Sequence, residues 1–226
     1  MWIHRSALFA LPVLMVARGA SADVKLPALV SDGMVLQEKA PVHIWGWADD
    51  GEKVKVSFRG QTASTEASHG HWSVTLHPLE AGGPFEMTIA GHNKVVLKDV
   101  LVGEVWVCSG QSNMEFDLAR AFEAKKELES PPDPRLRMFT VERHLADSPE
   151  EDVAGAWQSS APDTRGRFSA VGYYFGKALR KARNVPVGLI HTSWGGTPAE
   201  AWTSRETLLA WGLPSTAFRP AGPVDP

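Results

Sequence analysis

The 226-residue sequence predicts an α/β domain with a parallel sheet, preceded by an antiparallel β-sandwich or jelly-roll-like domain. Apolar and polar residues alternate with period two from residue 24 to about residue 100. Short apolar runs without alternation follow, separated by amphipathic helical patterns. Alternation is typical of strands with one solvated face, whereas continuous apolar strands between helices are typical of a buried parallel sheet. We therefore expect a β domain over residues 23–100 and an α/β domain over residues 101–226.

Three strands of the β domain show the alternation most clearly. Their inward positions are Val54, Val56 and Phe58 in one strand, Trp72, Val74 and Leu76 in the next, and Phe85, Met87 and Ile89 in the third. Turn sequences such as Asp49-Asp50-Gly51, His69-Gly70 and Gly82-Gly83-Pro84 separate the runs. Short strands between such turns favour a sandwich or a jelly roll.

The α/β domain is expected to begin with Val105-Trp106-Val107-Cys108, which resembles a strand buried on both faces. A helix is predicted next, because Met114, Leu118, Ala121 and Phe122 share one face at helical spacing. Further expected elements are a strand over residues 136–141, a helix around residues 170–179, a strand over residues 187–190, and a capping box at Thr203-Ser204-Arg205-Glu206 before a last helix.

This domain has only about three candidates for parallel strands, whereas doubly wound domains generally use five or more. Six of the last fifteen residues are Gly or Pro, and the periodic pattern is lost there. We therefore expect the α/β domain to be incomplete within these 226 residues. An incomplete sheet has an open edge and an uncovered apolar face, which predicts poor solubility.

Residues 1–22 have the form of a cleavable export signal. His4 and Arg5 give a weakly basic start, an apolar run covers residues 7–17, and Ala20-Ser21-Ala22 fits a small-x-small cleavage site. The run is too short to span a bilayer comfortably, so no stable membrane anchor is expected. The sequence predicts an exported protein, periplasmic or extracellular.

Charge and cysteine content narrow the class of protein further. The net charge is −3, and removal of residues 1–22 takes away Arg5 and Arg18 and makes it −5. A mildly acidic protein is a poor partner for a phosphate backbone, so nucleic acid is not expected. Cys108 is the only cysteine and excludes an intramolecular disulfide; its place after an apolar run favours a small buried residue over a nucleophile. Nothing in the sequence indicates an oligomeric state.

Ser112 stands between the first expected strand and the first expected helix of the α/β domain. In open α/β folds this place is the carboxyl edge of the sheet, where ligands bind and where the first helical amides lack internal partners. Those amides could stabilise an oxyanion, Gly110 would allow a tight turn, and Asn113 could donate a hydrogen bond or cap the helix. By position alone, Ser112 fits an N-cap as well as a nucleophile.

The segment Val107-Cys108-Ser109-Gly110-Gln111-Ser112-Asn113-Met114-Glu115 strongly resembles the nucleophile block of sialate O-acetylesterases and related carbohydrate acetylesterases, which belong to the SGNH hydrolase superfamily. Residues 186–202, which include Trp194-Gly195-Gly196-Thr197, resemble a second block of that family. Residues 29–37 resemble the start of its β-rich N-terminal domain. The three blocks occur in the family's order and span residues 24 to about 205.

The resemblance implies a serine carboxylic-ester hydrolase that removes O-acetyl groups from carbohydrates through an acetyl-serine intermediate on Ser112. Sialic acid is the leading substrate, and acetylated plant polysaccharide is the alternative. The resemblance further implies an oxyanion hole formed by the Ser112 amide and the amide of Gly195 or Gly196. Neither a metal nor an organic cofactor is expected. By position, Asn113 and Trp194 are candidate substrate-binding residues, and Trp202 is a second candidate for the substrate wall.

A serine nucleophile also needs a base, and the base needs an orienting group. The resembled family supplies them in a late Asp-x-x-His block, and a Gln-Gly-Glu segment adds to its oxyanion hole. Neither sequence occurs in this chain, so the catalytic His and Asp are expected beyond residue 226. His191 could act as a substitute base, but its position after an apolar run favours a strand-end residue beneath the site. The other histidines are expected at the surface, and no pair has the spacing of a zinc site.

Two other functions fit parts of the sequence. Trp45, Trp47 and Trp72 could stack on a sugar, which would make the β domain a non-catalytic glycan-binding module, although core packing is the commoner use of such residues. The chain could also be a fragment without function.

Overall fold

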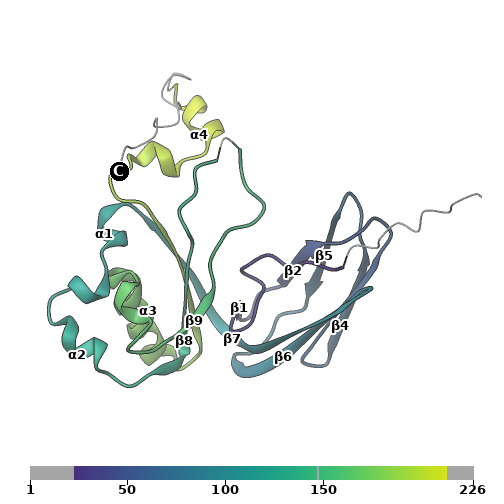
Figure 1. Cartoon of the computed structure of the whole chain (residues 1–226), viewed down its shortest axis with the longest axis horizontal. Coiled ribbons are helices and arrows are strands. Elements are labelled where there is room, and N and C mark those ends of the chain that lie inside the picture. Colours follow the sequence, from purple (N-terminus) through teal and green to yellow (C-terminus); the bar gives the residue numbers. More distant parts are fainter. Residues whose placement is uncertain (1–22, 147, 213–226) are drawn as a thin grey trace, which may run out of the picture.

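The computed structural model describes residues 23–146 and 148–212. The expected export signal and the last fourteen residues therefore lie outside the described residues. The described chain has two parts that share one long strand, β7 (Lys94–Gly110), and the helices gather on the side of the second part that faces away from the first (Figure 1).

The first part consists of strands. In order they are β1 (Val35–Gln37), β2 (Val42–Trp47), β3 (Lys53–Phe58), β4 (Gln61–Glu66), β5 (His71–Leu76) and β6 (Gly82–Ala90). β2 and β5 form a two-stranded antiparallel sheet, while β4, β3, β6 and β7 form an antiparallel run in a larger sheet.

A common apolar core joins these two sheets. The predicted inward residues of β3 and β5 are all buried, and so are Met87 and Ile89 of β6. Phe85 is half-buried and packs edge-on against Phe58, with ring centroids 5.9 Å apart. The period-two prediction is thus confirmed for these strands, because alternate side chains of each strand face the opposing sheet.

β7 runs from the first part into the second without a break. β6 pairs with it up to Val102, and β10 (Val187–Ser193) pairs with it from Glu104 onward. The expected domain boundary between residues 100 and 101 therefore falls inside a continuous strand. A hydrogen-bonded strand is stiff, so this connection fixes the two parts relative to each other.

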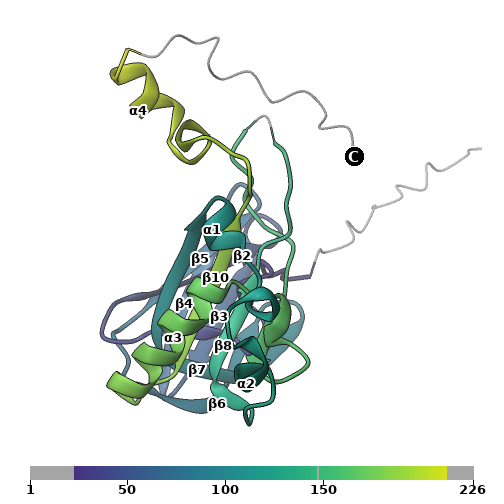
Figure 2. The ribbon, with the colours of Figure 1, turned by 90° about the vertical axis from the view of Figure 1, so that its left-hand side faces the viewer.

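The second part contains a sheet in the order β7, β10, β8 (Asp133–Thr140) and β9 (Trp157–Ser160). β10 is parallel to both β7 and β8, as the buried apolar runs predicted, and β9 is antiparallel. The helix α3 (Ala170–Arg183) packs on β10 and β8, which Figure 2 shows from the helical side. Its N-cap is Ser169, whose hydroxyl accepts the Gly172 amide at 3.1 Å.

The expected double burial of residues 105–108 is wrong. Trp106 is 44% exposed and Val107 is 64% exposed, whereas Cys108 is buried. The reason is that β7 is an edge strand beyond Gly103, where β10 is its only partner strand among the described residues. Phe175 of α3 covers Trp106 only in part, and Val107, on the opposite face of the strand, stays largely exposed.

The single helix expected over residues 114–122 is also wrong. The segment contains α1 (Ser112–Glu115), the 3₁₀ helix η1 (Leu118–Arg120) and α2 (Ala124–Leu128), and Phe122 is exposed. Asp117 is extended and forms a β-bridge with Ser169, and the Leu118 amide donates to the Phe168 carbonyl at 2.9 Å. These tertiary hydrogen bonds replace the helical ones, which local periodicity does not reveal.

Near the end of the described chain, η3 (Ala199–Trp202) precedes α4 (Arg205–Ala210). The helix α4 begins one residue later than the predicted capping box implies. Ser204, not Thr203, is its N-cap, and the Ser204 hydroxyl accepts the Thr207 amide at 3.3 Å.

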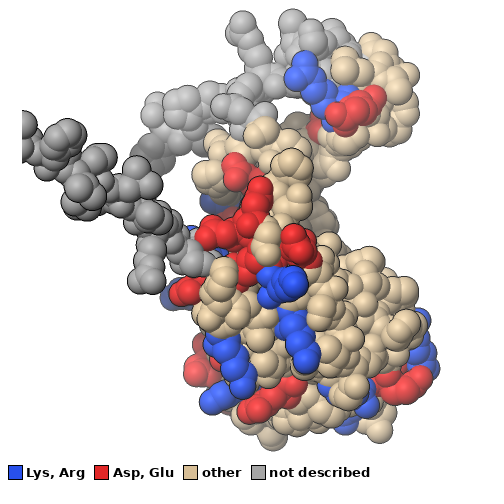
Figure 3. All heavy atoms as spheres, turned by 90° about the vertical axis from the view of Figure 1, so that its right-hand side faces the viewer, with Lys and Arg blue, Asp and Glu red and all other residues tan. Residues whose placement is uncertain are grey.

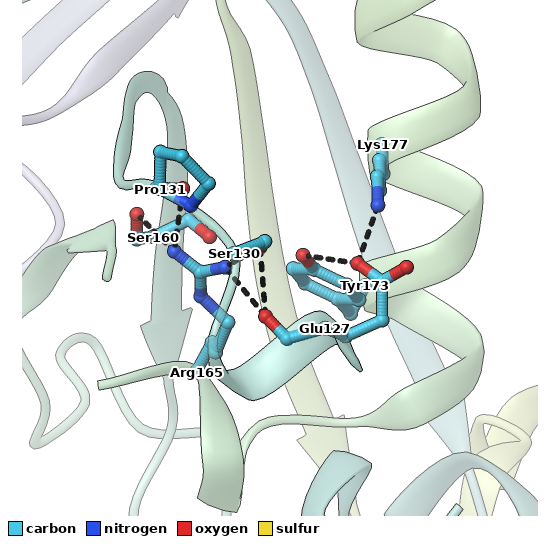
Figure 4. Close-up of polar contacts among 7 residues, drawn as sticks. All are labelled: Glu127, Ser130, Pro131, Ser160, Arg165, Tyr173 and Lys177. Carbon is cyan, nitrogen blue, oxygen red and sulfur yellow. Dashed lines mark hydrogen bonds and ion pairs between the residues drawn. The ribbon is translucent and has the colours of Figure 1, made fainter. Parts of the chain in front are cut away.

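Arg165 of the 3₁₀ helix η2 (Arg165–Arg167) links the end of α2, the segment after it and the end of β9, at the end of the sheet away from α1 (Figure 4). Its buried guanidinium donates to the Glu127, Pro131 and Ser160 carbonyls, at 2.8, 3.1 and 3.1 Å, and also contacts the Ser130 hydroxyl. Beside it, Tyr173 and Lys177 bind the Glu127 carboxylate. The hydrogen bond from Lys177 holds the pKa of Glu127 below its usual range.

Side chains also link the two parts of the molecule. Arg137 of β8 pairs with Asp99 at 2.7 Å, and the Trp157 indole donates to the Leu29 carbonyl at 3.0 Å. The connection between β8 and β9 is attached as well, because the Asp152 carboxylate accepts the Ala28 amide at 2.9 Å. The β domain therefore supports the segment that leaves β8.

Two surface properties bear on possible partners. None of the helices over residues 23–146 and 148–212 is long and apolar enough to cross a bilayer. On the face shown in Figure 3, acidic side chains gather in the middle and basic side chains are scattered beside them. This face does not present the continuous basic surface that a phosphate backbone would require.

Candidate active site

Ser112 lies in a single helical turn directly after β7. It is the first residue of α1, whose N-cap is Gln111, so it does not occupy the N-cap position that its sequence context also allowed. Its side chain is exposed, and its hydroxyl donates to the Gln111 side chain at 3.2 Å. Since α1 has only four residues, its dipole is small, and the donors that the turn offers are its first amides.

The residues after Ser112 fix this turn on the rest of the domain. Met114 packs against the second core cluster, and its sulfur accepts the Ser169 hydroxyl at 3.3 Å. The Phe116 carbonyl accepts the Ala170 amide at 2.8 Å. Before it, Gly110 has φ +141°, a backbone conformation that favours glycine. The exposed hydroxyl of Ser112 is thus held by a segment that is itself well anchored.

The loop after β10 approaches the same turn. The Trp194 amide donates to the Gly110 carbonyl at 3.0 Å, which extends the pairing with the last residue of β7 one residue past the end of β10. A Cβ atom placed on Gly195 would lie 3.6 Å from the Ser112 Cα atom. The two expected oxyanion segments are therefore neighbours in space.

The two glycines of this loop differ in their surroundings. Gly195 is half-buried, and its amide donates to the carboxylate of Glu115, at the other end of α1. Gly196 is exposed with φ +82°, a Cβ atom there would meet nothing within 4 Å, and its amide makes no hydrogen bond within the described residues.

Of the two candidate substrate-binding residues, Asn113 is exposed beside Ser112 and makes no hydrogen bond to any described residue. Trp194 lines a cavity of about 660 Å³ together with Arg143, His144 and Trp202. The Thr197 hydroxyl joins the two tryptophans, because it donates to the Trp194 carbonyl at 2.7 Å and accepts the Trp202 indole N–H at 2.8 Å. Neither Ser112 nor Gly195 lines this cavity.

His191 lies beneath the site and does not contact Ser112. It is buried, and its Nε2 is 2.6 Å from the Ser193 hydroxyl. Burial lowers the pKa of His191 below its ordinary value, so the neutral ring is favoured. The other described histidines are exposed, as expected, and the part of the chain that the structure describes has no cluster of metal-ligating side chains.

Cys108, the last buried residue of β7 before this site, offers no alternative nucleophile. Its side chain is buried, and burial raises the pKa of the thiol, which disfavours the reactive thiolate.

Two residues of the site had no predicted role. Glu115 is part of the resembled block but was given no function, and Arg143 follows β8, far away in the sequence. The Arg143 guanidinium pairs with the Glu115 carboxylate and lies 5.5 Å from the Trp194 ring. A carboxylate in the nucleophile block was the only available signal, and the sequence did not reveal its partners.

Comparisons with known proteins agree with this architecture. The model of the family described as carbohydrate esterase, sialic acid-specific acetylesterase, matches residues 102–215. Sialate O-acetylesterases from Rattus norvegicus and Homo sapiens are 36% and 35% identical over 90% and 93% of the chain. The chain spans only 42% and 45% of those relatives.

A crystal structure of a carbohydrate acetylesterase from Xanthomonas citri superimposes with a TM-score of 0.81 at 37% identity, covering 86% of this chain and 45% of that one. The family match includes the end of β7, the turn and the glycine loop that surround Ser112. The chain belongs to the family of sialic acid-specific acetylesterases among the carbohydrate esterases.

Proposed function

We propose that this chain carries the nucleophile of an enzyme that removes O-acetyl groups from carbohydrates, with O-acetylated sialic acid as the leading substrate. One observation carries the proposal: Ser112 is exposed in the turn after β7, and Gly195 lies beside it, so that a Cβ atom on Gly195 would be 3.6 Å from the Ser112 Cα atom. The relatives named sialate O-acetylesterase supply the substrate class.

The chemistry is acyl transfer. The Ser112 oxygen attacks the acetyl carbonyl, and the tetrahedral oxyanion is stabilised by the Ser112 amide and an amide of the Gly195-Gly196 loop. The sugar leaves with a proton, water hydrolyses the acetyl-serine, and acetate is released. No described imidazole contacts Ser112, and we assign the base to an Asp-x-x-His block of the kind that the family uses.

The substrate wall is part of the same proposal. Trp194 and Trp202 are assigned to the sugar side of the substrate, because aromatic rings that line a cavity offer flat apolar faces for sugar rings. Asn113 is assigned to a polar group of the substrate, because its amide is exposed and uncommitted beside Ser112.

The organisation of the chain is also proposed. Residues 23–100 are assigned to a sandwich or jelly-roll-like domain and residues 101–226 to the hydrolase domain, although β7 belongs to both. Residues 1–22 are assigned to a cleavable export signal. A mature protein that begins at Asp23, measured by intact mass in the exported fraction, supports this assignment, and a retained N-terminus contradicts it.

The test uses the protein encoded by the whole reading frame that contains this sequence. It should release acetate from O-acetylated sialic acid and from a small aryl acetate, and Ser112→Ala should lower kcat/KM by about 10³-fold or more. Ser109→Ala, the same change at an exposed position of β7, is the matched control and should retain activity. Full activity of Ser112→Ala would refute the assignment, and faster release from acetylated plant polysaccharide would favour the alternative substrate.

A further inference from the structure

Glu115 connects the nucleophile turn to the glycine loop. It is the last residue of α1, three residues after Ser112. One carboxylate oxygen accepts the Gly195 amide, and the other accepts the Arg143 guanidinium. The side chain is 31% exposed, so both contacts are shielded from solvent in part. The carboxylate thus touches residues that follow β10 and β8 while it belongs to the segment that follows β7.

Arg143 is held from two sides. Its guanidinium pairs with Glu115 and lies 5.5 Å from the Trp194 ring centroid, which is within the range of a cation–π contact. Trp194 is the neighbour of Gly195 in the loop after β10. Three strand ends therefore meet in one small cluster, which we define as Glu115, Arg143, Trp194 and Gly195.

Gly195 lies directly against the carboxylate of Glu115 and close to Ser112. A Cβ atom there would collide with the Glu115 carboxylate and approach the Ser112 Cα atom to 3.6 Å. The absence of a side chain thus allows the loop to reach both the carboxylate and the nucleophile. Two hydrogen bonds hold the loop beside the nucleophile turn: the Gly195 amide donates to Glu115, and the Trp194 amide donates to the Gly110 carbonyl.

This hydrogen bond also affects the oxyanion hole. In the free protein the Gly195 amide is already taken by a carboxylate, and an oxyanion at the same amide would meet that negative charge. The Gly196 amide is exposed and makes no hydrogen bond within the described residues. Arg143 compensates the Glu115 charge, so the site does not present an unpaired carboxylate to a developing anion.

We propose that Glu115 is a positioning residue, which rests on the proposed function: it fixes Gly195 against the nucleophile turn so that the Gly196 amide is the loop's donor to the oxyanion. Arg143 orients Glu115 and neutralises its charge. Neither side chain takes part in bond making, and both act through the loop.

The first experiment measures the hydrogen bond itself and needs no activity. Solvent exchange of the Gly195 amide is followed by NMR in the ¹⁵N-labelled chain. Glu115→Ala should accelerate that exchange by about tenfold or more, because a charge-assisted hydrogen bond is lost. Glu115→Gln should retain most of the protection, because its amide oxygen still accepts the Gly195 N–H.

Arg143→Gln is the second variant, and it keeps the experiment informative if Glu115→Ala does not fold. Arg143→Gln should accelerate the Gly195 exchange less than Glu115→Ala does. The acceleration in the double variant should be smaller than the product of the two single accelerations, because the two residues act through one contact. Glu129→Ala is the matched control. Glu129 follows the last residue of α2 and forms an exposed ion pair with Lys125 of that helix. Its removal should leave the Gly195 exchange unchanged.

The second experiment measures catalysis in the protein encoded by the whole reading frame. Glu115→Ala should lower kcat for an aryl acetate by about 10- to 100-fold, with KM changed by less than about threefold, since the loop donor acts in the transition state. Glu115→Gln should recover part of that loss.

Two results would overturn the inference: unchanged Gly195 exchange in Glu115→Ala, or a variant that raises KM while kcat stays the same. The tests separate this inference from the proposed function. If Ser112 is not the nucleophile, Ser112→Ala remains active while the exchange result still stands. If only the role of Glu115 is wrong, Ser112→Ala is inactive while the Gly195 exchange does not respond.

Discussion

At the scale of single residues, the site depends on side chains whose neighbours come from other strands. Ser112, Gly195 and Trp194 meet because β7 and β10 end together, with Gly110 opposite Ser193. Burial distinguishes the groups of the site: Ser112 is exposed and available to a substrate, whereas His191 is enclosed and bonded to Ser193. An enclosed imidazole of lowered pKa is suited to support the strand end and not to accept the Ser112 proton.

His191 makes a testable contribution to the pH dependence of stability. Burial lowers its pKa in the folded state below the ordinary value near 6.5, partly offset by the Met114 backbone and the Glu115 charge. As pH falls below about 6.5, the unfolded chain binds a proton that the folded chain does not, so the free energy of unfolding decreases. Above that pH the ring is neutral in both states and contributes no slope.

Urea unfolding between pH 7.5 and 5.0 tests this. The stability of the parent chain should fall more steeply on acidification than that of His191→Gln, in which the titrating group is absent. Equal slopes for the two proteins would show that His191 is not the source.

At the scale of elements, the short helices are stabilised by hydrogen bonds to other segments, because they are too short to be stable by their own internal hydrogen bonds. α1 and α2 have four and five residues, too few to be stable alone. The segment containing α1 is bonded to residues 168–170, and the end of α2 is bonded to Arg165. The turn that presents Ser112 therefore owes its geometry to packing against α3 and its N-cap.

Arg165→Met should destabilise the chain by about 2–4 kcal/mol, because it leaves the Glu127, Pro131 and Ser160 carbonyls without their buried donor. Arg165→Lys should recover little, since an ammonium cannot reproduce the guanidinium fork. Denaturant unfolding measures both. Arg167→Ala, an exposed arginine of the same short helix, is the control and should change stability by less than about 0.5 kcal/mol. A loss of similar size in the control would show that the effect is not specific to the buried guanidinium.

At the scale of the whole molecule, one face of the α/β part is unusually apolar. Trp106 of β7 and Val171, Tyr174 and Phe175 of α3 are large and exposed, and Trp106 contacts Phe175 with ring centroids 5.1 Å apart. Val107, the next residue of β7, is exposed on the opposite face of the strand. The same stretch of β7 has no second partner strand from Trp106 to Gly110 in the described part of the chain, whereas the Val105 amide before it donates to the Gln37 side chain. Such a face and edge favour association.

The 226-residue chain should therefore self-associate in solution, and Val107→Lys should reduce that association. Sedimentation velocity over a range of concentrations measures it. Phe122→Ser removes a residue that is more exposed but belongs to neither β7 nor α3, and it should have no such effect. A parent chain that stays monomeric at high concentration would contradict the prediction.

The sequence by itself determined three strands of the β domain, the parallel pairing of β10 with its neighbours, and the family, because periodicity and the block around Ser112 are local signals. Only the tertiary structure decided that residues 114–122 are not one helix, since hydrogen bonds to residues 168–170 outweigh local preference. It alone showed that Trp106 and Val107 are exposed, because burial depends on which strands are neighbours. It alone brought Glu115 and Arg143 together with Gly195, because their contact depends on where three strands end in space.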